Sequence, residues 1–218
     1  MINFIKNKHG FTLAEVLITL GIIGVVAAMT LPIVTLNARN SELHSRLKKA
    51  YNLIENSVLL VATEEGHMDN KFERVTYKDK LIKHFNISRD CGRNCLSSGE
   101  MTRMFKTFSN GLISDLYFDD GQFFLVDGSF IMVENFEPEQ LMVSVDLNGP
   151  YKNPNIWGVD IFTFEINSEG AVIPGGALGS KFSNKNRYCS KTSSDGYNGV
   201  GCTNDALFDK DYWKKIKY

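Results

Sequence analysis

One long uncharged stretch constrains this chain more than any other feature. Residues 16–38 contain no Asp, Glu, Lys or Arg. As an α-helix this stretch would extend about 35 Å, at about 1.5 Å per residue, which is enough to cross a hydrocarbon core of about 30 Å. Lys6 and Lys8 precede it, so we expect the amino terminus on the cytoplasmic side and the rest of the chain outside the membrane.

The apolar pattern changes after this stretch to that of an amphipathic helix. Apolar side chains recur at intervals of three and four: Leu43, Leu47, Tyr51, Ile54, Val58 and Val61. The pattern predicts one continuous helix from about Phe11 to about Glu65, with Gly66 as its stop. Pro32 lies inside this helix, where it removes one backbone hydrogen bond and predicts a kink or a loosened turn.

The carboxyl-terminal half of the chain has the alternation of β-strands. Strands are predicted at residues 112–118, 122–127, 129–134, 141–146 and 160–166, with turn sequences between several of them. Short helices are predicted at Tyr77–Phe85 and Glu100–Phe108, a surface loop at 174–197, and a last short helix or strand at 211–218. The expected fold class is α+β, with the long helix packed on the one buried face of an antiparallel meander.

Composition and cysteine spacing limit the possible environments and partners. The 24 Lys and Arg nearly balance the 25 Asp and Glu, so the whole chain lacks the charge signature of a nucleic-acid-binding protein. The four cysteines form an even set, as expected in an oxidising compartment. Three pairings are possible, and spacing favours Cys91 with Cys95 and Cys189 with Cys202.

The amino-terminal segment KHGFTLAEVLITLGIIGVVAAMTLP resembles that of the type IV pilin superfamily, which includes pilins, type II secretion pseudopilins and competence pseudopilins. The resemblance rests on a short basic leader, Gly10 before Phe11, Glu15 as the fifth residue counted from Phe11, and Pro32 at the end of the apolar run. It implies that a prepilin peptidase cleaves between Gly10 and Phe11 and methylates the Phe11 amine.

The same resemblance divides the chain into four parts. They are a leader (1–10), a transmembrane and assembly helix (11–36), its amphipathic continuation (37–66) and a globular α+β head (67–218). The Cys189–Cys202 segment is similar to the disulfide-bounded loop of many pilins, although a general stabilising role explains it equally.

The resemblance also gives Glu15 a role in assembly. The carboxylate would pair with the Phe11 amine, in its own subunit or in a neighbour, and so fix the register of apolar helices. Pro32 would let the helix yield during packing. The alternatives are that Glu15 extends to the lipid headgroups and that Pro32 is a passive kink.

The implied partners are other pilin-like subunits, the prepilin peptidase, an inner-membrane assembly platform and its ATPase. The expected location is the cytoplasmic membrane, with a single span and the head outside, followed by a filament at the cell surface or in the periplasm. The protein would be a structural subunit of a type IV pilus or a type II secretion pseudopilus.

Other functions stay open. One is a minor pilin-like subunit whose head binds DNA, a surface or a secreted substrate. Three aromatic residues, Phe182, Tyr188 and Tyr197, lie among the basic residues Lys181, Lys185, Arg187 and Lys191, a composition that single-stranded nucleic acid could use, although a solvated loop has it too. The other is a secreted or membrane-anchored protein with an ordinary signal peptide cleaved after Ala28.

A calcium site is a further expectation. Residues 146–170 resemble the region of major secretion pseudopilins near a calcium site, and Asp146, Asn148 and Asp160 supply oxygen ligands that calcium prefers. They do not form a complete EF-hand loop, and Asp and Asn are also common turn residues. No other cofactor is expected.

No catalytic motif is evident in the sequence. His44, His67 and His84 lack zinc-protease spacing, and residues 174–181 lack P-loop spacing. Cys91 and Cys95 are separated by three residues instead of the two of a redox C-x-x-C site. We therefore expect a protein that is not an enzyme.

Overall fold

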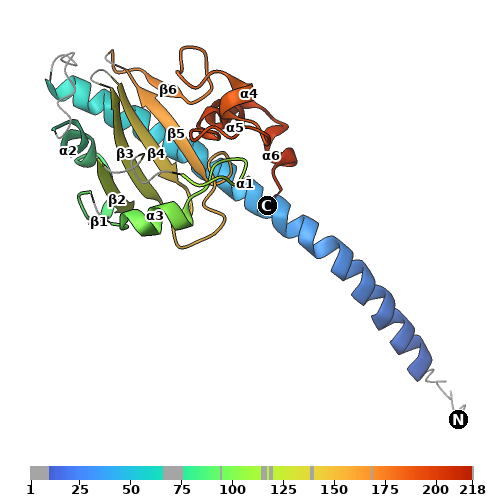
Figure 1. Cartoon of the computed structure of the whole chain (residues 1–218). Helices are drawn as coiled ribbons and strands as arrows, with labels where there is room; N and C mark the ends of the chain where they lie inside the picture. The colour runs from blue at the N-terminus through green and yellow to red at the C-terminus, as the bar shows by residue number, and fades with distance from the viewer. Residues whose placement is uncertain are drawn as a thin grey trace, which may run out of the picture. The chain divides into compact units, whose positions relative to one another are not determined.

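The structure is a computed structural model that describes residues 10–65, 76–93, 95–113, 117, 120–137, 140–167 and 169–217. The chain divides into two compact units, residues 1–39 and 40–218. Helix α1 (Leu13–Glu65) runs through the division and continues past Pro32 without interruption. The predicted single long helix is therefore confirmed (Figure 1).

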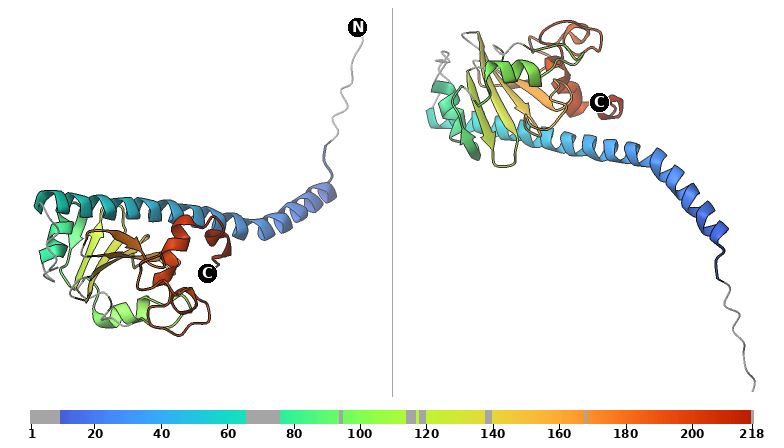
Figure 2. Two further views of the ribbon diagram at one scale, coloured as in Figure 1. Left: turned by 90° about the horizontal axis from the view of Figure 1, so that it is seen from above. Right: turned by 60° about the horizontal axis from the view of Figure 1, so that its bottom comes forward.

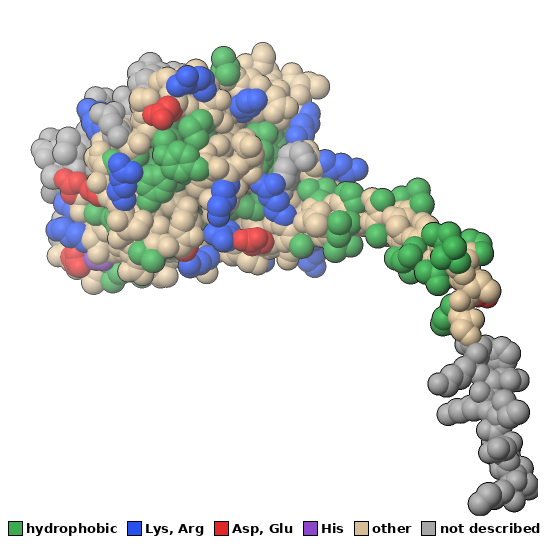
Figure 3. Space-filling view, turned by 90° about the horizontal axis from the view of Figure 1, so that it is seen from below, with side chains coloured by type: hydrophobic (Ala, Val, Ile, Leu, Met, Phe, Trp, Pro, Cys, Tyr) green, Lys and Arg blue, Asp and Glu red, His purple; other side chains and the backbone are tan. Residues whose placement is uncertain are grey.

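The first unit consists, in its described part, of the apolar half of α1. Its side chains are exposed from Gly10 to Thr35, and Leu20, for example, is 61% exposed. Among the described residues, α1 is long and apolar enough to cross a membrane. Figure 3 shows hydrophobic side chains covering this half of the helix.

The second unit is built on an antiparallel sheet whose strand order follows the chain order. The described strands are β1 (Ile87–Asp90), β2 (Gly121–Leu125), β3 (Phe130–Glu137), β4 (Gln140–Asp146), β5 (Ile161–Ile166) and β6 (Val172–Pro174). Together with α1 they confirm the predicted α+β class and the meander (Figure 2).

Individual strand predictions differ in their outcome. Strands β2 to β5 correspond to the predicted segments from 122–127 to 160–166. The prediction at 112–118 is not supported where the structure describes it, because Leu112 makes an isolated bridge to Lys106 and Tyr117 lies in a 3-10 turn. Residues 114–116 and 118 of that segment lie outside the described residues. The short edge strands β1 and β6 were not predicted from the sequence.

The second half of α1 packs on one face of the sheet, as predicted. Its apolar stripe, which includes Leu47 and Ile54, shares one buried cluster with alternate residues of the strands, such as Val133 and Val143. Leu47 is fully buried. Each such side chain contributes about 1.5–3 kcal/mol to the free energy of unfolding.

The prediction that only one face of the sheet is buried is wrong. Phe130, Met132 and Met142 point to the opposite face, where they join a second cluster with Trp157 and Phe182. Polar strand residues on this face are buried with partners. The Ser144 and Thr163 hydroxyls lie 2.8 Å apart, and Glu165 accepts a hydrogen bond from Ser180. Ser180 comes from the 174–197 segment, which the sequence predicts as a surface loop.

Short helices complete the second unit. They are α2 (Thr76–Ile82), α3 (Ser98–Met104), α4 (Lys185–Tyr188), the 3-10 turn η2 (Val200–Cys202), α5 (Thr203–Phe208) and α6 (Tyr212–Lys215). Helices α2, α3 and α6 lie within or beside the three predicted helical segments. Helix α6 lies beside α1, where the buried Asn40 side chain donates to the carbonyls of Trp213 (2.7 Å) and Ile216 (3.2 Å).

The four cysteines form two disulfides in the second unit. Cys91 is bonded to Cys95, and Cys189 is bonded to Cys202. These are the pairs that the sequence spacing favours. The Cys189–Cys202 bond joins the end of α4 to η2, and Cys202 is buried in the cluster that α1 shares with the sheet.

Candidate functional site

A capping box closes the amino-terminal end of α1. Thr12 precedes the first helical residue, and its backbone N–H and hydroxyl donate to Glu15 Oε2 at 2.8 and 2.9 Å. In return the Glu15 N–H donates to the Thr12 hydroxyl at 3.2 Å. Two helix-end donors are thereby satisfied by one reciprocal pair.

This contact gives Glu15 a partner within its own subunit. The residues near it in the chain have exposed apolar side chains, including Phe11 (89% exposed) and Leu17. Only Oε2 is engaged by described residues, so Oε1 is available to a second donor. The role of Thr12 was not predicted from the sequence, although a Thr-x-x-Glu pattern before an apolar run is the recognised signal for a capping box.

The other predicted residues of the first unit show few specific contacts. A side chain placed on Gly10 would meet no atom within 4 Å. Pro32 sits within the helix and has no N–H to donate to the carbonyl of Ala28. The structure places both at exposed positions on an apolar surface, and the predicted Gly10/Phe11 cleavage stays a prediction.

The three predicted calcium ligands lie close together at the junction of β4 and β5. Asp146 ends β4, Asp160 precedes β5, and both are fully buried. Asp146 Oδ1 accepts from the N–H groups of Asn148 (3.2 Å) and Gly149 (3.0 Å). Asp160 accepts from the N–H groups of Asn155 (3.0 Å) and Ile156 (2.7 Å).

Three oxygens near this pair lack a partner. They are Asp146 Oδ2, Asn148 Oδ1 and Asn155 Oδ1, all buried and without a hydrogen bond. Burial, and secondarily the neighbouring Asp160 carboxylate, raises the pKa of Asp146 well above its usual value. Buried oxygens without donors beside two carboxyl groups fit a hard cation that prefers oxygen ligands.

The carboxylates of Asp146 and Asp160 alone do not make a complete set of ligands for a metal ion. Among the described residues, no three His, Cys, Asp or Glu side chains are grouped so that they could hold a metal. A cation here would need the amide oxygens of Asn148 and Asn155 besides the two carboxylates. Asn155, which the sequence analysis did not include, adopts a φ of 54° and is held by its amide N–H to the Pro150 carbonyl at 2.7 Å.

The predicted aromatic and basic segment is arranged differently from a nucleic-acid platform. Phe182 is buried in the second cluster, and Tyr188 and Tyr197 pack against it with ring centroids 5.1 and 5.3 Å away. Lys185 pairs with Asp205 at 2.7 Å and Arg187 pairs with Asp195 at 2.6 Å. The aromatic rings therefore stabilise the head and do not form an exposed stacking surface.

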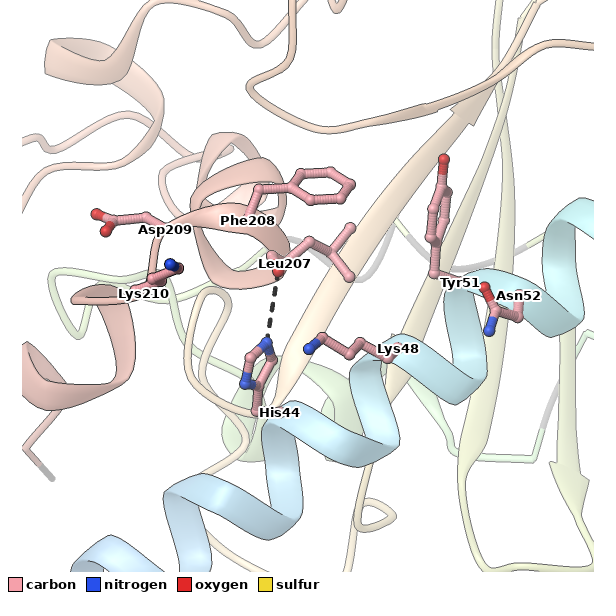
Figure 4. A pocket seen from close by; sticks show the side chains of 8 residues that line it. All are labelled: His44, Lys48, Tyr51, Asn52, Leu207, Phe208, Asp209 and Lys210. Atoms are coloured by element: carbon pink, nitrogen blue, oxygen red, sulfur yellow. Dashed lines mark hydrogen bonds between the residues drawn. The ribbon is translucent and has the colours of Figure 1, made fainter.

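A hollow of about 470 Å³ lies between α1 and the end of α5 with the two residues that follow it. It is lined by His44, Lys48, Tyr51, Asn52, Leu207, Phe208, Asp209 and Lys210. Figure 4 shows His44 directed at the Leu207 carbonyl, with Nε2 3.4 Å from that oxygen. His44 is thus engaged by the backbone, while His67 lies outside the described residues.

Comparison with known proteins gives one match. Residues 5–31 match the family model of the prokaryotic N-terminal methylation motif. No curated protein and no solved structure matches the chain. The matched segment contains Gly10, Phe11, Thr12 and Glu15, and ends one residue before Pro32. The chain therefore carries the prepilin-type motif of type IV pilins and pseudopilins on a long helix that leads into a pilin-like α+β head.

Proposed function

We propose that this chain is a structural subunit of a type IV pilus or a type II secretion pseudopilus. A prepilin peptidase cleaves it between Gly10 and Phe11 and methylates the new amine. The subunit then stays in the cytoplasmic membrane, with its head outside, until it is assembled into a filament. The observation that carries this proposal is the methylation motif at residues 5–31, which includes Glu15 in an otherwise apolar, exposed helix.

The exposure of the first unit supports both stages of this proposal. A helix with apolar side chains on every side is unfavourable in water. Its free energy is lower in a bilayer or among similar helices, where this apolar surface is buried. The second unit, by contrast, buries its own apolar stripe against the sheet. The first unit is therefore the part that needs a partner, lipid before assembly and neighbouring helices after it.

The capping box supports a change of partner for the Glu15 carboxylate during processing and assembly. In the precursor, the carboxylate is satisfied by Thr12, which lowers the cost of carrying it in an apolar segment. Cleavage creates a cationic amine on Phe11, one residue before Thr12, and equivalent amines on neighbouring subunits. An ion pair with such an amine uses the available Oε1 and aligns adjacent helices.

Mass spectrometry of the mature amino terminus tests the processing step. We expect a chain that begins with N-methylated Phe11. A chain that begins at Met29 would overturn the proposal in favour of a secreted protein with an ordinary signal peptide.

Two substitutions at Glu15 separate its charge from its hydrogen bonds. Glu15→Gln keeps an oxygen that can accept from Thr12 but removes the charge, whereas Glu15→Leu removes both. We expect both variants to be processed and inserted but to form few filaments in an assembly assay. Leu17→Ala, a matched control on the same exposed surface, should assemble. Normal filaments with Glu15→Gln would remove the ion pair from the proposal.

A bound calcium ion in the head is a second proposal. The three buried oxygens without partners at Asp146, Asn148 and Asn155 support it. The ion would neutralise the two buried carboxylates and hold the 147–160 loop against the end of β4. Thermal unfolding of the full chain in detergent, with added calcium or with a chelator, measures this contribution as a shift in Tm.

A further inference from the structure

Leu178 is fully exposed at the tip of the loop between β6 and α4. Leu178 and Gly179 are the central residues of a β-turn, which the Ser180 N–H closes by donating to the Ala177 carbonyl at 3.1 Å. Gly179 has a φ of 90°, in the left-handed region that favours glycine. The turn thus presents the leucine side chain to solvent.

A buried carboxylate fixes the end of this loop. Glu165, in β5, is fully buried, and it accepts hydrogen bonds from the Ser180 hydroxyl and, at 3.1 Å, from the Lys181 N–H. The Ser180 hydroxyl also accepts from the N–H groups of Gly176 (3.1 Å) and Phe182 (2.9 Å). Because a buried carboxylate is costly without such donors, the folded head keeps the loop in this conformation.

Close backbone packing fixes the start of the same loop. A Cβ on Gly175 would lie 2.2 Å from the Val200 carbonyl oxygen, and a Cβ on Gly176 would lie 2.0 Å from the Gly201 carbonyl oxygen. The backbone therefore fits against η2 only because these residues are glycines. With both ends of the loop held, the tip cannot fold back to bury Leu178 without breaking these contacts.

The fixed loop distinguishes Leu178 from other exposed apolar residues. Single exposed leucines are common on protein surfaces and need no partner. A leucine on a preorganised turn, however, loses little conformational freedom when a partner covers it, so most of the free energy of its burial is available for binding. Leu178 therefore has the properties of an anchor for another molecule.

The hollow shown in Figure 4, which we call the α5 hollow, offers an apolar concave surface for such an anchor. Phe208 is 64% exposed, and its ring meets the half-buried Tyr51 ring edge-on, with centroids 6.4 Å apart. Lys48 and Lys210 also line the hollow, and lysine stems are apolar. Its volume of about 470 Å³ exceeds the cavity of about 150 Å³ that accepts benzene in an engineered protein, so a leucine side chain has room there.

Leu178 and the α5 hollow belong to the same compact unit, residues 40–218, so every copy of the head carries both. Leu178 does not enter the hollow of its own chain, because its side chain is fully exposed. A contact between two different patches of one protein is heterologous, and it repeats as a ring or as an open helical array. An open helical array is the geometry of the filament in the proposed function.

We propose that Leu178 of one copy inserts into the α5 hollow of a second copy, against the Phe208 and Tyr51 rings. This inference rests on the proposed function, to which it adds a specific contact between heads. Each copy donates one leucine and accepts another, so the contact propagates along a filament. Leu178 and Phe208, both exposed in the single chain, become buried together.

Site-specific photo-cross-linking of the full chain in detergent tests this contact. The photoreactive amino acid p-benzoylphenylalanine replaces Leu178, and isotopically labelled and unlabelled chains are mixed so that mass spectrometry recognises links between two copies. We expect links from position 178 to the peptides that contain Tyr51 or Phe208. We also expect a ladder of dimers, trimers and larger species, because a heterologous contact does not close at two copies.

Two substitutions at exposed residues test whether the α5 hollow is the receptor. Phe208→Ala in the photoreactive chain should lower the yield of these links about tenfold, the effect of leaving one large apolar side chain unburied. Leu112→Ala is the matched control, because Leu112 is also an exposed residue of the head (68%), and it should leave the yield unchanged.

Sedimentation equilibrium of chains without the photoreactive residue tests Leu178 itself. Leu178→Ala should weaken self-association about tenfold, because the truncated side chain no longer fills the hollow. Leu178→Met keeps the volume of the side chain and should associate like the wild type.

Three results would overturn the proposal. They are links from position 178 only to position 178 of the other copy, an absence of links to the peptides of the α5 hollow, and equal losses of yield in Phe208→Ala and Leu112→Ala. The assay uses the uncleaved chain and needs no filament. A mature chain that begins at Met29 would therefore contradict the proposed function without changing the cross-linking result.

Discussion

The two halves of α1 form one continuous helix but have opposite relations to their surroundings. Before residue 40, apolar side chains cover every side of the helix and are exposed, as at Leu20. From residue 40 onward, a single stripe is apolar and buried, as at Leu47, while Lys48 and Asn52 face outward. One half is completed by its own head, and the other requires an apolar environment from elsewhere.

This difference shows how one helix can serve two purposes. Periodicity in the second half specifies a unique contact face, so its partner can be the rigid sheet. The first half has no preferred face, and its polar exception, Glu15, is the feature that can give direction to its packing. The face that stabilises the head and the surface available for the proposed assembly thus lie on separate parts of the same helix.

The largest expected effect separates the two halves directly. Leu47→Ala should lower the free energy of unfolding of the head by about 2–5 kcal/mol, because it leaves a cavity under the sheet. Leu20→Ala should change it by less than about 0.5 kcal/mol. Thermal or denaturant unfolding of the full chain in detergent measures both. Equal losses would show that the head depends on the first unit.

The disulfides should affect only the second unit. Replacing both Cys189 and Cys202 with Ser removes a bond across 13 residues and should cost about 3 kcal/mol. The same change at Cys91 and Cys95, four positions apart in the sequence, should cost about 2 kcal/mol because the closed loop is shorter. The ranking is checked by urea unfolding under non-reducing conditions, and the reverse order would contradict it.

Asp146→Asn tests the buried carboxyl pair within the head. With calcium bound, the wild type should be stabilised by about 2.7 kcal/mol at a calcium concentration 100 times Kd, and the variant should lose this response. Without a cation, the same substitution relieves repulsion between Asp146 and Asp160 and should raise Tm. The direction of the Tm change in calcium therefore decides between the two cases.

The smallest expected effect concerns the capping box in the first unit. Thr12→Val keeps the shape of the side chain but removes its hydroxyl, at a cost of about 1 kcal/mol to the first turn. Amide exchange of residues 13–16 in micelles should become about fivefold faster, with an unchanged Tm of the head. Thr12→Ser is the control and should exchange like the wild type.

Features with a strong period were predictable from the sequence. The 53-residue helix and strands β2 to β5 follow from spacings of three to four and of two. The edge strands β1 and β6 are four and three residues long, too short for a period to appear. Burial of the second face was also unpredictable, because its cover includes Phe182 in a segment rich in Gly, Ser and Asn.

The candidate sites, too, could be predicted from the sequence only in part. Glu15 stood out because a carboxylate in an apolar run is costly, and its partner Thr12 could have been found from the capping-box pattern. Asp146 and Asp160 were identifiable as residue types, but their burial depends on the loop between them.

The hydrogen bonds from Asn40 to the Trp213 and Ile216 carbonyls have a mechanical consequence. A pull along α1 reaches the head first at Asn40, where the load divides between the helix and the last turn of the chain. The last turn of the chain also contacts the core, because Trp213 is buried in the cluster that α1 shares with the sheet. Tension on the helix would therefore act on the last turn of the chain as well as on the helix itself.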